Sequence, residues 1–323
     1  MKKIFELKNI HIKFPISNDF FNNKKDFVHA VNGIDLEIYQ NEIISIVGES
    51  GCGKSTLAKT ILGLEKKTQG EIYFNGKNTN NFSKEDFKNF TKKCQLVFQN
   101  PFSSLNPRMT IYQILKEPLI VHGIKNKLEI NQKIENALNL VGLNKDTQNR
   151  FPHEFSGGQR QRIAIARSLI LEPEIIIADE PVSALDVSIQ AQIINLLLEL
   201  KEKLNLTIIF ISHDLNVVKH ISDRVAVMYL GKIVELTTKD ELFNHPLHPY
   251  TKALLSAVPQ IKTDNKSGLI PLEGDLPSVK NLPQGCYFAS RCKYAQPICY
   301  ENYPLNNNNS THNVFCHFAN ELE

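Results

Sequence analysis

The sequence lacks several features that would narrow its function at once. Its formal net charge is only +3 and its basic residues are scattered, which gives little support to a nucleic-acid-binding protein. No stretch approaches eighteen consecutive apolar residues, so no membrane-spanning helix is predicted. The opening residues hold neither the apolar core nor the cleavage site of a secretory signal, and we therefore expect a cytoplasmic chain. No internal repeat is present.

What remains is typical of a globular protein of two or three domains, with 323 residues of which 42% are hydrophobic and 22% charged. Residues 1–75 have the patterns of strands and turns, whereas apolar positions three and four apart predict helices over 110–143. Continuous β-branched runs at 174–179 and 207–212 predict buried parallel strands. Strands that alternate with helices indicate an α/β fold. Beyond about residue 238 the chain is richer in Pro, Asn and His, which predicts a domain boundary there.

A glycine-rich loop follows the predicted strand at 42–47 and precedes a predicted helix. It reads GESGCGKS and matches the phosphate-binding pattern G-x-x-x-x-G-K-[ST]. Its glycines let backbone N–H groups surround phosphate oxygens, Lys54 reaches the β- and γ-phosphates, and Ser55 offers its hydroxyl to Mg²⁺. A chance glycine-rich turn is the alternative, against which the strand and helix context argues. The expected nucleotide contacts are Gly48, Glu49, Ser50, Gly51, Cys52, Gly53, Lys54, Ser55 and Thr56.

Two carboxylates end the predicted strand at 174–179. Asp179 is placed to hold the Mg²⁺ shell, and Glu180 to orient and deprotonate an attacking water. A solvated strand end is the alternative, which the loop upstream makes the weaker interpretation. An N-K-x-D sequence, the guanine-reading pattern, occurs only at 23–26, in a polar segment that we expect to be a loop, and adenine is favoured.

A second glycine-containing motif, FSGGQRQR at 155–162, indicates the class of protein. Ser156 is a candidate N-cap for a helix that we expect to continue to Pro173. The motif resembles the signature of ATP-binding cassette (ABC) proteins. The other motifs of that family follow the family's order: Gln99 after a strand, the signature, Asp179 and Glu180, the SALD sequence that ends at Asp186, and His213.

The resemblance implies an α/β P-loop NTPase fold, an ABC cassette over residues 1–238. Its RecA-like core has a mostly parallel sheet, an antiparallel β edge and a helical subdomain at about 100–167. It also implies an ATPase in which ATP lies between two such subunits. A soluble, non-transport ABC ATPase is a less favoured alternative, because those proteins usually fuse two cassettes or insert a long coiled coil.

The family's residue roles carry over to matching positions. The signature, Ser156, Gly157, Gly158 and Gln159, would contact ATP held by the opposing subunit, and Asp186 would couple the two sites across the dimer. Ser55, Gln99 and Asp179 would form the Mg²⁺ shell, with Gln99 also sensing the attacking water. The expected catalytic residues are Glu180, Gln99 and His213, which would hold the γ-phosphate. Phe14 is the candidate to stack on adenine, with Phe27 as the alternative.

The chain beyond the cassette, 239–323, resembles the C-terminal extension of the ATPase subunits of dipeptide and oligopeptide importers, and GESGCGKST and QNPFSSLNPRMT resemble the subunit usually designated F. The resemblance implies four partners: a homologous ATPase, two membrane permeases and an extracytoplasmic peptide-binding protein. It also implies a peripheral location on the cytoplasmic face of the cell membrane. Importers of nickel, glutathione or antibiotic peptides remain alternatives, because this chain need not touch the transported substrate.

Four of the six cysteines, Cys286, Cys292, Cys299 and Cys316, lie in this extension. Their spacing is longer than the C-x₂₋₄-C pairs of zinc sites, whereas the ligands of a [4Fe–4S] cluster can be spaced irregularly. The resemblance to peptide importers favours the cluster. Zinc, with His312 or His317 as a further ligand, is the second hypothesis, disulfides the third and unrelated buried thiols the last.

Overall fold

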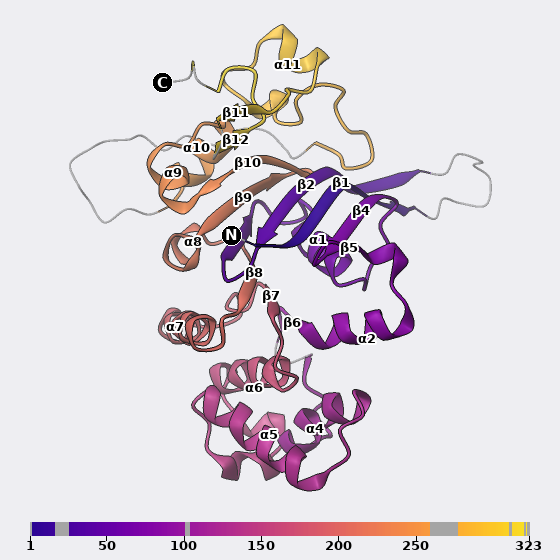
Figure 1. Ribbon diagram of the computed structural model, residues 1–323. Coiled ribbons are helices and arrows are strands. Elements are labelled where there is room, and N and C mark those ends of the chain that lie inside the picture. Colours follow the sequence, from indigo (N-terminus) through magenta and orange to yellow (C-terminus); the bar gives the residue numbers. More distant parts are fainter. Residues whose placement is uncertain are drawn as a thin grey trace. The chain divides into compact units, whose positions relative to one another are not determined.

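The computed structural model describes residues 2–16, 26–100, 104–258, 277–309, 312–319 and 321. The chain divides into two compact units that each draw on separate stretches of sequence. The first unit comprises 1–2, 39–43 and 81–212, and the second comprises 3–38, 44–80 and 213–323. The segments within each unit can be followed in Figure 1 by their labels.

The first unit combines a parallel sheet with helices. Its strands β6 (Cys94–Val97), β7 (Ile175–Asp179) and β8 (Thr207–Ser212) are parallel, and β7 lies between the other two. Its α-helices are α2 (Lys84–Lys93), α4 (Ile111–Val121), α5 (Lys127–Leu140), α6 (Gly157–Leu169) and α7 (Val187–Leu204). Short 3₁₀ segments, η2 (Lys145–Asn149) and η3 (Pro152–Glu154), lead into α6. Helices α4, α5 and α6 pack on one another, as Figure 1 shows.

The strands of this unit follow directly from composition. Every residue of β7 and β8 is buried, as expected for parallel strands covered on both faces, and each strand contains three isoleucines. The helices predicted over 110–143 are confirmed as α4 and α5. Helix α6 ends at Leu169, earlier than the expected stop at Pro173, because the chain makes a turn at Ile170–Glu172 before the proline is reached.

The second unit contains two sheets. One is antiparallel, in the order β2 (Phe27–Tyr39), β1 (Lys3–Pro15), β4 (Gln69–Phe74) and β5 (Lys77–Asn78). In the other, β3 (Ile43–Val47) is parallel to β9 (Arg224–Tyr229), and β10 (Lys232–Thr238), β12 (His312–Val314) and β11 (Asn307–Asn309) follow with antiparallel pairing. The helical elements are α1 (Lys54–Ile61), η1 (Thr79–Asn81), α8 (Leu215–Ile221), α9 (Lys239–Asn244), α10 (Pro249–Ser256), η4 (Ala289–Arg291) and α11 (Pro297–Glu301), η1 ending at the border of the two units.

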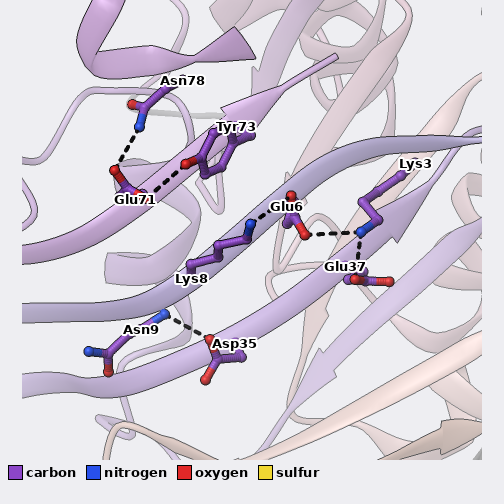
Figure 2. Close-up of polar contacts among 9 residues, drawn as sticks. All are labelled: Lys3, Glu6, Lys8, Asn9, Asp35, Glu37, Glu71, Tyr73 and Asn78. Carbon is purple, nitrogen blue, oxygen red and sulfur yellow. Dashed lines mark hydrogen bonds and ion pairs between the residues drawn. The ribbon is translucent and has the colours of Figure 1, made fainter. Parts of the chain in front are cut away.

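One face of the antiparallel sheet carries a row of polar contacts, shown in Figure 2. Lys3 lies between Glu6 and Glu37, with Nζ–Oε distances of 3.0 and 2.6 Å. Glu71 accepts hydrogen bonds from Tyr73 and Asn78. Alternate residues of β1 instead point into the core, where Phe5, Leu7 and their neighbours are buried. This alternation is the pattern of a sheet with one buried and one solvated face.

The C-terminal extension is built into the second unit rather than standing apart from it. Strand β12 pairs with β10, so that Glu235 lies opposite Val314. Helix α10 and the turn at η4 pack on β9 through Tyr229, Tyr250 and Phe288, whose ring centroids lie 4.7–5.4 Å apart. The sequence boundary near residue 238 remains a prediction, since the contacts group the extension with the glycine-rich loop. Among the described residues no helix is both long and apolar enough to cross a membrane.

Candidate nucleotide site and cysteine cavity

The glycine-rich loop connects β3 to α1 and has the backbone that its pattern predicts. Gly48, Gly51 and Gly53 have φ angles of 152°, 80° and 102°. A Cβ atom at Gly48 would lie 2.1 Å from the carbonyl oxygen of Met228, and one at Gly53 would lie 2.1 Å from that of Ala30. Two of the three glycines are therefore fixed by close backbone approaches as well as by their φ angles.

Lys54 is buried at the start of α1 and folds back over this loop. Its Nζ donates to the carbonyl oxygens of Gly48 and Glu49 at 2.8 and 2.9 Å, and lies 3.7 Å from the sulfur of Cys52. Burial raises the pKa of the Cys52 thiol, so this side chain fills space as a neutral group. Because Lys54 donates to carbonyl oxygens of its own loop, it can exchange these bonds for bonds to phosphate oxygens, and the residues therefore fit a nucleoside triphosphate.

The two predicted carboxylates and Gln99 lie together in the first unit. Asp179 is the last residue of β7 and is buried, with an exposed fraction of 6%. Glu180 follows it with φ of 45°, a left-handed conformation that is uncommon outside glycine, and its N–H donates to the carbonyl oxygen of Ile211. The Nε2 of Gln99 donates to Oε2 of Glu180 at 2.8 Å. The turn after β7 therefore holds the Glu180 carboxylate in direct contact with the Gln99 amide.

The signature residues begin α6 as expected. Ser156 is the N-cap, and its hydroxyl and the Gln159 side chain form a reciprocal capping box. A Cβ at Gly158 would lie 2.4 Å from Cγ2 of Ile189, so only glycine allows α6 to pack this closely on α7. Gly157 has more room, with Leu185 at 3.4 Å. The signature residues thus place backbone N–H groups at the start of α6, an arrangement that favours binding of an anion.

The remaining predicted residues divide between the two units. Asp186 is the N-cap of α7. The pKa of its carboxyl is lowered mainly by the hydrogen bond that it accepts from the N–H of Ile189, and less by the one from the Ser188 hydroxyl. His213 is exposed in the second unit, directly after β8. Phe14 near the end of β1 and Phe27 at the start of β2 each expose 36% of their surface, and exposure alone does not choose between them. The structure describes neither Pro101, Phe102 nor Ser103 of the QNPFSS sequence.

The four cysteines of the extension line a single small cavity of about 20 Å³, together with His248 and His317. All six cysteines of the chain are free thiols. Burial, with smaller contributions from the neighbouring cysteines, raises the pKa of Cys286 to about 12 and that of Cys316 to about 11. Across the described ranges, however, no three His, Cys, Asp or Glu side chains are close enough to hold a metal ion. The metal centre predicted from the sequence is therefore not shown among the described residues, although its four cysteines line one cavity.

Sequence reasoning missed the polar residues that attach the extension. Glu235 on β10 is fully buried, accepts from the backbone N–H groups of Leu247 and His248, and contacts Nε2 of His312 at 2.7 Å. Arg291 makes an ion pair with Glu49 of the glycine-rich loop, 242 residues earlier. No motif links residues so far apart, and only the buried position of Glu235 within a strand could have drawn attention to it.

The loop, the signature helix and the paired Gln99 and Glu180 define an ABC-type P-loop ATPase. The ABC transporter family model matches residues 31–183, and the model for the oligopeptide/dipeptide transporter C-terminal region matches 234–299. The chain is 54% identical to the oligopeptide transport ATP-binding protein AppF of Bacillus subtilis over 97% of each chain. It is 48% identical to OppF of Escherichia coli over 98% of this chain and 96% of that protein. The chain belongs to the ABC transporter family, in the branch formed by these ATP-binding proteins.

Solved structures agree with this assignment. The ATP-binding cassette MJ0796, in a dimeric post-hydrolysis state with ADP and phosphate, matches with a TM-score of 0.64 and 30% identity. The match covers 73% of this chain and 99% of that one. CbiO1 of Clostridium perfringens matches with the same TM-score, covering 76% and 92%. The α/β ABC cassette predicted from the sequence is confirmed, and the chain is an ATP-binding, ATP-hydrolysing subunit.

Proposed function

We propose that this chain hydrolyses ATP to power the import of dipeptides or oligopeptides through a membrane transporter. The observation that carries the proposal is the match of its C-terminal residues 234–299 to a region named for oligopeptide and dipeptide transporters, together with 54% identity to AppF. A cassette alone would support only ATP hydrolysis. Import of nickel, glutathione or antibiotic peptides is the alternative, and the two differ in substrate rather than in the chemistry of this subunit.

In the proposed mechanism the residues mainly position charges. Lys54 exchanges its bonds to the carbonyls of Gly48 and Glu49 for bonds to phosphate oxygens. Ser55, Asp179 and Gln99 are the proposed ligands for Mg²⁺, which would supply positive charge at the phosphates. Glu180 accepts the proton of the attacking water, and the Gln99 amide, which donates to Glu180 at 2.8 Å, orients this carboxylate.

Two further residues and the signature motif act on the triphosphate or across a dimer. His213 is proposed to hold the γ-phosphate and Asp186 to connect two sites. Residues Ser156–Gln159 are proposed to bind the γ-phosphate on the opposing subunit, since α6 presents its N-terminus without an acidic residue in its first turn. ATP hydrolysis would require a second ATPase chain, homologous or identical to this one.

The test of the catalytic assignment is Glu180→Gln. We expect turnover to fall roughly 10²- to 10⁴-fold while nucleotide affinity is retained, because the amide cannot accept the proton. Glu174→Gln is the matched control, because Glu174 precedes the opposite end of the same strand and forms a surface ion pair with Lys93. ATP hydrolysis by Glu180→Gln at the rate of Glu174→Gln would refute the role of Glu180.

The proposed partners are a homologous ATPase, two permeases and an extracytoplasmic peptide-binding protein, with this chain peripheral on the cytoplasmic face of the membrane. Similarity to oligopeptide transport ATP-binding proteins over 97% and 98% of this chain supports this arrangement. Uptake of labelled di- and oligopeptides by cells that carry Glu180→Gln, compared with Glu174→Gln, tests it. Loss of nickel or glutathione uptake with intact peptide uptake would favour the alternative substrates.

For the cysteine cavity we propose a [4Fe–4S] cluster held by Cys286, Cys292, Cys299 and Cys316, with zinc as the alternative. Four thiols that line one cavity would each lose a proton to bind a positively charged group, which would offset the charges of the resulting thiolates. Because the thiols are not spaced as an assembled site, the cavity must adjust on binding, and no catalytic step is derived through the cluster.

Iron, sulfide and zinc analysis of anaerobically purified protein tests this proposal. We expect roughly four irons and four sulfides per chain, absent when all four cysteines are changed to serine. Cys94→Ser is the control, because Cys94 is buried on β6 in the first unit and lines no part of the cavity. One zinc per chain would support the alternative, and neither metal would refute both.

A further inference from the structure

The glycine-rich loop contains one acidic side chain, Glu49, although the task of the loop is to bind an anion. The carbonyl oxygen of Glu49 accepts from Lys54 Nζ, so this residue lies beside the lysine that meets the phosphates. A free carboxylate at this position would repel a triphosphate and compete with it for the lysine. Some other group must therefore offset the charge of Glu49.

That group is Arg291 of the C-terminal extension. Its Nη1 donates to Oε2 of Glu49 at 2.8 Å and its Nη2 to Oε1 at 3.1 Å, which is a two-pronged guanidinium–carboxylate pair. The exposed fractions of the two side chains are 6% for Arg291 and 21% for Glu49, so water screens this pair little. The guanidinium also lies 3.4 Å from the hydroxyl of Tyr229 on β9.

The extension holds the backbone of Glu49 as well. The N–H of Glu49 donates to the hydroxyl of Tyr250 at 2.9 Å. Tyr250 is fully buried on α10, and its ring packs on Tyr229 and Phe288. The direction of the Glu49 side chain and of its peptide group is thus set by residues more than 200 positions further along the chain.

We infer that Arg291 and Tyr250 are positioning residues for nucleotide binding, and that the C-terminal extension thereby helps the glycine-rich loop to bind phosphate. Arg291 neutralises Glu49 and turns its carboxylate toward the extension, so that Lys54 and the loop N–H groups present a net positive charge to the phosphates. This role goes beyond the proposed import function and requires no metal in the cysteine cavity.

The position of Arg291 depends in turn on the cysteine-lined cavity. Arg291 lies on η4, between Cys286 and Cys292. The N–H of Ala289 donates to the carbonyl oxygen of Cys286, and the N–H of Cys292 donates to that of Ala289. The short turn that carries the guanidinium is therefore closed at both ends by cysteines of the cavity.

The test is the affinity of the full-length chain for Mg²⁺ and a non-hydrolysable ATP analogue, measured by calorimetry. We expect Arg291→Ala to weaken binding roughly tenfold, because it leaves an unpaired carboxylate in the loop. Arg291→Lys keeps the charge but not the paired geometry, and its affinity should lie between those of wild type and Arg291→Ala. Tyr250→Phe should weaken binding roughly threefold through loss of the hydroxyl.

The decisive variant is Glu49→Gln combined with Arg291→Ala. Removing the carboxylate removes the repulsion, so this double variant should bind several-fold more tightly than Arg291→Ala alone. The defect of Arg291→Ala should also shrink as salt is raised. If Arg291→Ala binds as tightly as wild type, or if the double variant is no better than Arg291→Ala, the inference is wrong.

Two controls separate this inference from the assignment of the site itself. Lys145→Ala removes the cation of an exposed ion pair with Glu135 in the first unit and should leave affinity unchanged. Lys54→Ala should abolish binding whatever the role of Arg291. Tight binding by Lys54→Ala would refute the assignment of the glycine-rich loop as the nucleotide site. Wild-type affinity of Arg291→Ala, or a double variant no better than Arg291→Ala, would refute only the role of Arg291.

Discussion

The glycine-rich loop and the C-terminal extension lie in one compact unit but are held in different ways. The loop is fixed by backbone against backbone, at Gly48 against Met228 and Gly53 against Ala30, and Gly231 donates its N–H to the carbonyl of Cys52. The extension is fixed by a few buried side chains, among them Glu235 and Arg291. The fold of the loop therefore depends mainly on close backbone packing, whereas attachment of the extension also depends on charge and protonation.

The largest effect should come from the backbone contacts. Gly53→Ala places a methyl group 2.1 Å from the carbonyl oxygen of Ala30, at φ of 102°. We expect it to lower the free energy of unfolding by more than about 4 kcal/mol and to abolish nucleotide binding. Urea unfolding and calorimetry measure both.

Gly51→Ala is the matched control for this prediction. Gly51 has a φ of 80°, but a Cβ there meets no atom within 4 Å. It should cost only about 1 kcal/mol, the price of the left-handed backbone. Equal losses for the two variants would mean that conformation, not close approach, fixes the loop.

The second effect tests the buried carboxylate of the extension. Glu235→Ala leaves the N–H groups of Leu247 and His248 and the ring of His312 without their acceptor. We expect the free energy of unfolding to fall by about 3–4 kcal/mol. Glu71→Ala is the control, because Glu71 accepts from two side chains in the exposed row of Figure 2 and should cost less than about 0.5 kcal/mol. If Glu235→Ala lowered the free energy of unfolding as little as Glu71→Ala, apolar contacts would be what holds the extension.

The third effect is a pH dependence centred on His248, the N-cap of α10. Burial lowers its pKa from 6.5 to about 4, although the Glu235 carboxylate and the carbonyl of Phe315 both favour protonation. Between these two pH values the unfolded chain binds a proton that the folded chain does not, so stability falls as pH falls through this window. The full change is roughly 2–4 kcal/mol.

His248→Asn tests this assignment by removing the titrating ring while keeping a side-chain acceptor for the N–H of Tyr250. The fall in urea midpoint between pH 6.5 and 4.5 should be smaller in His248→Asn than in wild type. The Glu235 carboxylate near His248 acts differently, because its pKa is lowered and the stability that it contributes is lost only at lower pH. Parallel pH curves for the two proteins would assign the loss to other groups.

These two regions also differ in how far the sequence predicted them. The loop was predictable because its eight residues are contiguous and their types follow from phosphate chemistry, and Ser156, Asp179 and Glu180 were likewise predicted from short local motifs. The pairing of Glu49 with Arg291 was not predictable, because it joins residues 242 positions apart and no local pattern encodes it. Strand β12, with three residues, is too short for periodicity to reveal, and it depends on pairing with β10.

A smaller effect should decide which aromatic residue stacks on adenine. Phe14 and Phe27 are equally exposed on neighbouring strands of the antiparallel sheet. Loss of one stacking ring should weaken binding of the non-hydrolysable ATP analogue roughly three- to tenfold. We expect this loss in Phe14→Ala, with Phe27→Ala as its control. The reverse result would assign the base contact to Phe27 on β2. Affinities equal to that of wild type in both variants would exclude both rings from the base contact.

The smallest effect should come from the exposed ion pairs of Figure 2. Lys3 lies 2.6 Å from Glu37 and 3.0 Å from Glu6, and these hydrogen bonds, that of Glu37 first, raise the pKa of Lys3. Because water and salt screen these charges, we expect Lys3→Ala to leave the urea midpoint unchanged within error at physiological salt. The pair of Arg291 with Glu49 has similar distances but is largely buried, and Arg291→Ala should lower the midpoint under the same conditions. If Lys3→Ala were the more damaging of the two, burial would not be what distinguishes the contacts of the extension from those of the surface.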